Sequence, residues 1–194
     1  MDSRMEWNRV KNELLSSVNQ VEIFEKEITT DRNDTRIEAI RNNTDSIVIN
    51  KYLRLLGAGK SPYENVHLFN QEAEKAFGEK NDIVAYDAFG GLFAVKGTIQ
   101  YFAPDTLEWE NTEKDGDDFV RWLASGSLRG FYSCFLWDKS EEVINRLQLG
   151  QGILMYPFLW SKECDIDAAD KKLVPYRELL ELNGEFYKSF QELK

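Results

Sequence analysis

Three β-rich runs between residues 82 and 102 stand so close together that they restrict the fold more than any other feature of the sequence. The runs are Asp82 to Phe89, Leu92 to Val95 and Thr98 to Phe102, and the links between them are Gly90-Gly91 and Lys96-Gly97. Tight two-residue links join antiparallel neighbours, whereas parallel strands need a long crossover. The segment therefore predicts an antiparallel meander.

Further strands are predicted on both sides of this meander. Upstream, Ser46 to Ile49 and Tyr52 to Leu56 flank Asn50-Lys51, a link whose first member tolerates a left-handed backbone. Downstream, the sequence from Leu107 to Glu110 alternates apolar and acidic residues, which is typical of a strand with one packed face and one wet face. The sheet region is therefore expected to span about residues 46–110.

Helical patterns flank the sheet region. Apolar residues at spacings of three and four predict an N-terminal helix over about residues 5–26 and a terminal helix over Tyr176 to Phe190. Shorter helices are expected at Gln71 to Phe77, Asp115 to Ala124, Leu128 to Trp137 and Glu141 to Leu149, with another inside the polar connection 29–43. Ile153 to Trp160 is expected to form a strand or buried turn, and Cys164 to Lys172 a linker.

These elements predict one α+β domain over residues 1–194, with a central, mostly antiparallel sheet flanked by helices. Its helical and mixed C-terminal part is expected to cover about residues 115–194. The length is enough for one sizeable core. The oligomeric state is not predicted.

The charge balance limits the classes of partner. The chain has 34 acidic and 24 basic residues and a net charge of -10, which opposes binding to nucleic acid or to an anionic membrane and favours a basic partner or none. No apolar run approaches the roughly 20 residues needed to cross a bilayer, and the first residues lack the pattern of a secretory signal. With only two cysteines, the expected compartment is the cytoplasm.

No cofactor or metal site is expected. Gly57-Ala58-Gly59-Lys60-Ser61 ends like a phosphate-binding loop, but Arg54 stands where the motif needs its first glycine, and Pro62 follows directly. His67 is the only histidine, so nucleophile–histidine pairs would all have to share it. Both thiols lie in apolar or acidic surroundings, which raise a thiol pKa and make a poor nucleophile.

The chain is therefore not expected to be an enzyme, although one carboxylate-based alternative stays open. Glu108 and Glu110 share one strand face with Asp105 just before them, and such a pair could divide acid and base roles. Asp87 is a second candidate for that work. A solvated acidic strand face is the simpler interpretation of the pair.

Four blocks of sequence resemble a known family. They are Asp87-Ala88-Phe89-Gly90-Gly91-Leu92-Phe93-Ala94, Tyr101-Phe102-Ala103-Pro104-Asp105-Thr106-Leu107-Glu108-Trp109-Glu110, Phe131-Tyr132 and Tyr156-Pro157-Phe158-Leu159-Trp160. Their order resembles bacterial domain-of-unknown-function family 2625, which implies no activity. A β run ending near Gly90-Gly91, followed by the helix around Asp118 to Leu123, is similar to the second half of SUKH superfamily domains, and many of those are immunity proteins that block a toxin.

Three functions remain open from the sequence. The first, which the SUKH resemblance implies, is an immunity-type protein whose acidic surface docks against a basic toxin such as a nuclease. The second is an intracellular scaffold or regulator, and the third is the carboxylate enzyme. The expected partner-binding residues are Asp105, Glu108, Glu110, Asp115, Asp117 and Asp118.

Overall fold

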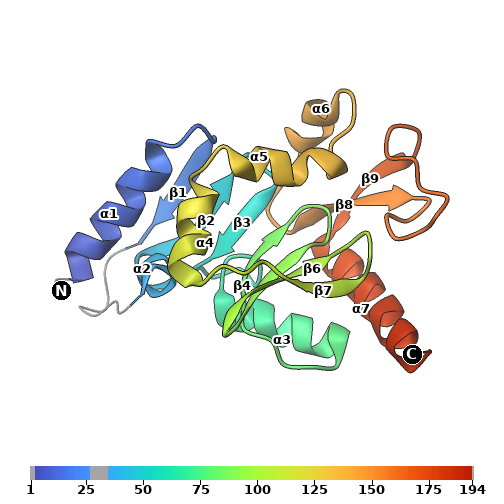
Figure 1. Ribbon diagram of the computed structural model, residues 1–194, viewed down its shortest axis with the longest axis horizontal. Helices are drawn as coiled ribbons and strands as arrows, with labels where there is room; N and C mark the ends of the chain where they lie inside the picture. The colour runs from blue at the N-terminus through green and yellow to red at the C-terminus, as the bar shows by residue number, and fades with distance from the viewer. Residues whose placement is uncertain (1–2, 27–34, 194) are drawn as a thin grey trace.

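The predicted meander is confirmed as part of a larger antiparallel sheet. The structure, a computed structural model, describes residues 3–26 and 35–193. Within these residues the sheet consists of β1 (Val21–Glu25), β2 (Thr44–Ile49), β3 (Leu53–Leu56), β4 (Ile83–Asp87), β5 (Leu92–Lys96), β6 (Thr98–Ala103) and β7 (Glu108–Asn111). Each strand pairs antiparallel with the next along the chain, so spatial order follows sequence order (Figure 1).

The hairpin between β2 and β3 closes at the predicted link. Asn50 and Lys51 both adopt left-handed backbone angles, with φ of 50° and 64°. Ile49 lies opposite Leu53, so the loop has three residues, Asn50, Lys51 and Tyr52, one more than the predicted two-residue link. Tyr52, which was expected to begin the second strand, belongs to the turn, and β3 begins at Leu53.

The N-terminal helix is shorter than predicted, and the sheet begins earlier. α1 (Ser3–Leu15) ends before Val18, and Val21 belongs to β1 at the edge of the sheet. The side-chain amide of Asn19 donates to the backbone oxygens of Leu123 and Ser125 at 3.0 and 2.9 Å. These tertiary bonds fix a turn after α1, so the helical spacing of Val18 and Val21 did not indicate a helix.

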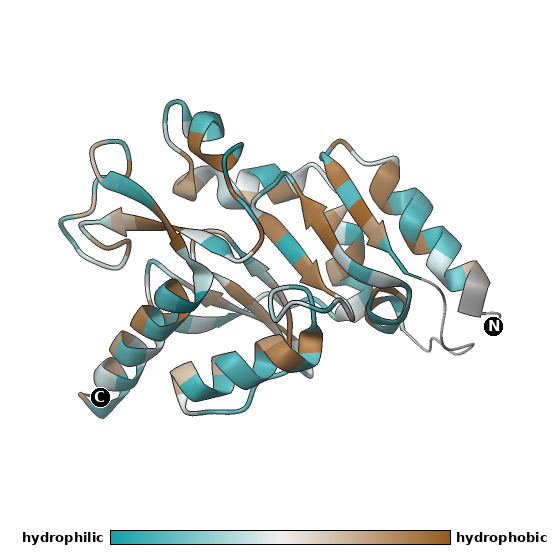
Figure 2. Ribbon diagram, turned by 180° about the vertical axis from the view of Figure 1, so that it is seen from behind, coloured by the Kyte–Doolittle hydropathy of each residue, from teal (hydrophilic) through white to brown (hydrophobic). Residues whose placement is uncertain are grey.

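The helices are distributed over both faces of the sheet (Figure 2). One face packs on α1, α2 (Arg36–Asn43), α4 (Gly116–Leu123) and α5 (Ser127–Tyr132), and the other packs on α3 (Val66–Phe77) and α7 (Tyr176–Glu192). The predicted short helix in the connection 29–43 is confirmed as α2, while residues 29–34 lie outside the described residues. Within the described ranges, no helix has the length and apolar character needed to cross a membrane.

The C-terminal part differs from prediction in three places. The helix expected over Leu128 to Trp137 ends at Tyr132 and continues as a 3-10 turn, and α6 (Ser140–Ile144) is shorter than the expected Glu141 to Leu149 helix. The supposed linker 164–172 contains the start of β9 (Asp170–Pro175), which pairs with β8 (Gln151–Tyr156). Pairing with distant β8 orders this polar segment, and no local sequence pattern indicates it. The terminal helix is confirmed as α7.

The core on the α4 and α5 side is built from aromatic rings. Phe93, fully buried on β5, contacts Tyr101, Phe119, Trp122 and Phe131, with ring centroids 4.6 to 6.1 Å apart. All four ring pairs are tilted, and aromatic pairs at such distances stabilise a core beyond the area they bury. This cluster fixes α4 and α5 against β5 and β6, where the candidate site lies.

Candidate functional site

The most deeply buried carboxylate of the described chain is Asp87, the last residue of β4. Its exposed fraction is 0%, and it stands opposite Leu53 in the sheet. Asp87 ends a fully buried strand, two residues before the expected end at Phe89, and the turn Ala88-Phe89-Gly90-Gly91 follows before β5 begins. A charged side chain is rarely fully buried unless partners satisfy it.

Four donors satisfy the carboxylate of Asp87. Oδ1 accepts from the backbone N–H groups of Phe89 and Gly91, each at 2.9 Å. Oδ2 accepts from the hydroxyls of Tyr101 on β6 and Tyr132 on α5, each also at 2.9 Å. Because two bonds at each oxygen use the acceptor positions of a carboxylate, Asp87 is a structural link between the β4–β5 turn, β6 and α5.

Burial and hydrogen bonding act on Asp87 in opposite directions. Burial raises the pKa of its carboxyl above the ordinary value, while the bonds from Gly91, Tyr101, Tyr132 and Phe89 lower it in part. Burial also raises the pKa values of both tyrosines, and the negative charge of Asp87 adds to that effect. The tyrosines therefore stay protonated and remain donors.

Close packing around Gly91 explains the Gly90-Gly91 pair. A tight connection between strands was the interpretation favoured from the sequence, and it needs no ligand. A Cβ atom at this position would lie 2.2 Å from both Asp87 Oδ2 and the hydroxyl oxygen of Tyr101. Gly90 has a φ of 100°, a backbone conformation that residues with a side chain rarely adopt. The pair is therefore required by the chain turning around the Asp87 carboxylate.

Two tyrosine hydroxyls provide a matched test of this arrangement. Tyr132→Phe removes a bond to Asp87 and is expected to lower the free energy of unfolding by about 1.5 to 3 kcal/mol. The Tyr176 hydroxyl is equally buried but has no hydrogen-bond partner among the described residues. Tyr176→Phe should therefore leave the free energy of unfolding unchanged or raise it by about 1 kcal/mol. Urea unfolding measures both, and equal losses in the two variants would refute the assignment.

The exposed carboxylates of β7 lie where the sequence predicted them. Glu108 and Glu110 are exposed, while Trp109 between them is half-buried on the opposite face. Their register partners on β6 are Ala103 and Tyr101, so both glutamates point to the side of the sheet that carries α4 and α5. Asp105, exposed in the β6–β7 turn, lies at the end of the same strand pair. The three residues together are called the acidic strip.

The other three predicted binding residues have roles within the fold. Asp115 caps α4, since its side chain accepts from the backbone N–H of Asp118 at 2.8 Å. Asp118 pairs with Arg121 at 2.8 Å, and Asp117 accepts from the backbone N–H of Arg36 at 3.4 Å. Negative charge in the first turn of a helix stabilises that helix. These structural roles explain the positions of Asp115, Asp117 and Asp118, so no binding protein is needed to account for them.

The loop that resembles a phosphate-binding motif ends β3 instead of opening a helix. Gly57 and Ala58 form bridges to Asn65, and α3 begins only at Val66. The Asn65 side chain accepts from the first backbone N–H groups of α3, the groups that would otherwise be directed at a phosphate. His67 lies exposed in this first turn.

Neither thiol is activated. Burial raises the pKa of Cys134 and of Cys164, and the carboxylates of Asp105 and Asp165 act in the same direction. This agrees with the sequence prediction that both are poor nucleophiles. Among the described residues, no cluster of three or more His, Cys, Asp or Glu side chains is placed to hold a metal ion.

Sequence comparison identifies the family. Residues 2–179 match the profile of the family described as protein of unknown function DUF2625. The chain is 27% identical over 208 aligned positions to an uncharacterized protein, YbfG, of Escherichia coli (strain K12), and the alignment covers 96% of this chain and 94% of that protein. No solved structure matches the fold significantly. The order of blocks around Asp87, the acidic strip and Tyr156 to Trp160 is thus explained: the chain belongs to the DUF2625 family.

Proposed function

We propose that the protein is a non-catalytic binding module of the immunity type, whose acidic strip docks against a basic protein such as a nuclease toxin. The observation that carries the proposal is the rigid placement of the strip. Glu108 and Glu110 stand on a strand paired to β6, and Trp109 between them packs against Phe102 at 5.4 Å between ring centroids. Carboxylates held on a packed strand present a fixed pattern of charge to a partner.

Electrostatics supports a basic partner. With a net charge of -10, the protein attracts positively charged proteins over long range, and such steering raises association rates. Aromatic side chains near the strip could supply the buried contacts that set affinity. Phe131 is half-buried on α5 and packs edge-on against Tyr101, the register partner of Glu110.

The geometry of Asp87 favours this proposal over the carboxylate enzyme. A general acid or base must reach its substrate, and Asp87 is enclosed and satisfied by four bonds from the protein itself. The scaffold alternative gives the acidic surface no role beyond solubility. It is distinguished from the immunity type by whether a basic partner exists.

Reversing the charge of the acidic strip is expected to weaken binding of the basic partner. The variant Asp105→Lys with Glu108→Lys and Glu110→Lys should bind a basic partner about tenfold or more weakly, because attraction becomes repulsion. The measurement is co-purification from lysate of the source organism at low and moderate salt, with quantitative mass spectrometry. We expect a single basic protein to co-purify in a stoichiometric amount. The co-purified amount should fall at moderate salt and fall with the charge-reversal variant.

A matched control carries the same change in charge elsewhere. Glu178, Glu185 and Glu192 are exposed on α7, which covers the opposite face of the sheet, and their reversal to lysine should leave the partner bound. Loss of the partner in the α7 variant as well would assign the effect to net charge alone. An empty eluate from the wild-type protein would favour the scaffold alternative.

A further inference from the structure

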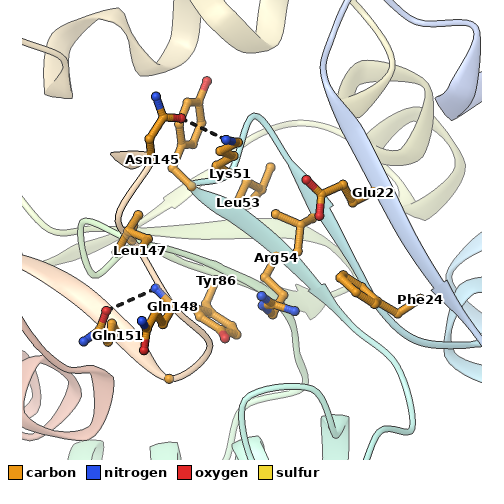
Figure 3. A pocket seen from close by; sticks show the side chains of 14 residues that line it. Glu22, Phe24, Lys51, Leu53, Arg54, Tyr86, Asn145, Leu147, Gln148 and Gln151 are labelled. Atoms are coloured by element: carbon orange, nitrogen blue, oxygen red, sulfur yellow. Dashed lines mark hydrogen bonds between the residues drawn. The ribbon is translucent and has the colours of Figure 1, made fainter. Parts of the chain in front are cut away.

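A groove lies over β1 to β3 on the sheet face that packs on α3 and α7 (Figure 3). Its volume is about 260 Å³. The floor comes from β2, β3 and β4, one wall from β1 and the other from the segment between α6 and β8. The side chains used below are Glu22, Lys51, Arg54, Asn145, Gln148 and Gln151.

Arg54 is the central charge of the groove. It lies on β3 in register between Val48 and Tyr86, and its Nη1 donates to Ser46 Oγ at 2.8 Å. The residue is only partly exposed, yet in the part of the chain that the structure describes its guanidinium forms no ion pair. Arg36 shows the contrast, because this buried arginine pairs with Glu6 and Glu13.

The guanidinium of Arg54 is half-buried and forms no ion pair with any described residue, although the chain has 34 acidic residues. Guanidinium groups in proteins recognise carboxylates through two parallel hydrogen bonds. Arg54 bonds to the hydroxyls of Ser46 and Tyr86, and its five N–H groups exceed these two partners. Burial away from water makes such a charged hydrogen bond stronger. Arg54 is therefore a charged donor that forms no ion pair with a carboxylate of the described residues, including Glu22 in the same groove.

The rest of the groove is polar and suits a small ligand. Lys51 adds a second cation, whose Nζ donates to Asn145 Oδ1 at 2.9 Å, and Gln151 Oε1 accepts from the backbone N–H of Gln148 at 3.1 Å (Figure 3). These amides hold the wall opposite β1 in place and present further donors and acceptors. A volume of about 260 Å³ is slightly below the range of drug-sized pockets.

We infer that the groove binds a small organic carboxylate, with its carboxylate group on Arg54 and its remaining polar groups on Lys51 and the amides. Glu22 in the β1 wall opposes a doubly charged phosphate and leaves a singly charged, planar carboxylate as the better fit. The groove lies on the sheet face opposite to that of Glu108 and Glu110, and three strands away from β6. The inference therefore stands or fails independently of the proposed partner.

The test is titration of the isotopically labelled full chain followed by backbone amide resonances. The probes are acetate, propionate and L-glutamate, each with a net charge of -1 near neutral pH, with propionamide as the uncharged analogue and inorganic phosphate as the competing anion. Up to about 10 mM, which exceeds a millimolar dissociation constant, at least one carboxylate should give saturable shifts at residues 51–54 and 145–151. Propionamide should give none.

Variants connect the shifts to Arg54. Arg54→Gln should weaken binding about tenfold or more, because a charge-assisted pair is lost. Arg54→Lys, which keeps the charge without the fork, should weaken it less, and Arg177→Gln on exposed α7 should change nothing. Unchanged amide spectra outside the groove verify that each variant is folded, and the Arg54→Lys series decides the matter where Arg54→Gln does not fold.

Three results would overturn the inference. The first is the absence of saturable shifts with all three carboxylates. The second is equal affinity in wild type and in the Arg54 variants. The third is phosphate binding as tightly as the best carboxylate, which would make the groove a general anion site.

Discussion

Replacing Asp87 with alanine is expected to lower the free energy of unfolding by about 3 to 5 kcal/mol. The substitution leaves two buried tyrosine hydroxyls and two backbone N–H groups without their acceptor. A loss of this size is a large part of the total stability of an ordinary domain. Urea unfolding followed by tryptophan fluorescence measures it.

Asp87→Asn is the matched control for this prediction. An asparagine oxygen can still accept from Phe89 and Gly91, and its amide can donate to the hydroxyls of Tyr101 and Tyr132, which then act as acceptors. The expected loss is therefore smaller, about 1 to 2 kcal/mol. Equal, small losses for alanine and asparagine would show that the carboxylate does not link the three elements.

Gly91→Ala is expected to cost about 3 kcal/mol, the second largest effect. The added methyl group would lie 2.2 Å from two oxygens that share a hydrogen bond, so Asp87 and Tyr101 must separate. Overpacking in a well-packed core typically costs up to about this amount. The backbone at Gly91 is not left-handed, so the loss would come from this contact alone.

Gly130→Ala is the matched control for Gly91→Ala. It measures the general effect of replacing a glycine with alanine where the added methyl group meets no neighbouring atom. Gly130 lies within α5, and a Cβ atom there would meet nothing within 4 Å. This substitution should raise the free energy of unfolding by about 0.5 to 1 kcal/mol, because alanine favours the helix and restricts the unfolded chain. A Gly91→Ala variant that is equally stabilised would contradict the geometry around Asp87.

The sequence predicts the sheet better than the packing between distant segments. Short links such as Asn50-Lys51 indicate that neighbouring strands run antiparallel, so the hairpin and meander could be inferred locally. The register of the hairpin could not, because Tyr52 joins the turn and Ile49 pairs with Leu53. β1 was missed because Val18 and Val21 continue a helical spacing, while bonds from Asn19 to residues over 100 positions away turn the chain. The pairing of β9 with β8 is equally non-local.

The same limit applied to the candidate sites. The exposed carboxylates of β7 were predicted because alternation is a property of one strand. The role of Asp87 was missed because its tyrosine partners lie 14 and 45 residues further along the chain. An acidic residue ending a fully apolar strand next to Gly-Gly was the available signal. The groove around Arg54 joins residues 22–24, 48–54 and 86–88 to residues 145–151, which only the folded chain brings together.

The most direct test of the central claim, that the acidic strip docks a basic protein, is a hydrogen-exchange footprint of the co-purified complex. The exchange rate of each backbone amide is compared between the free protein and the complex. The account predicts slower exchange at residues 105–111, in the β6–β7 turn and along β7 at the edge of the sheet. Slower exchange confined to other surfaces, with residues 105–111 unchanged, would contradict it.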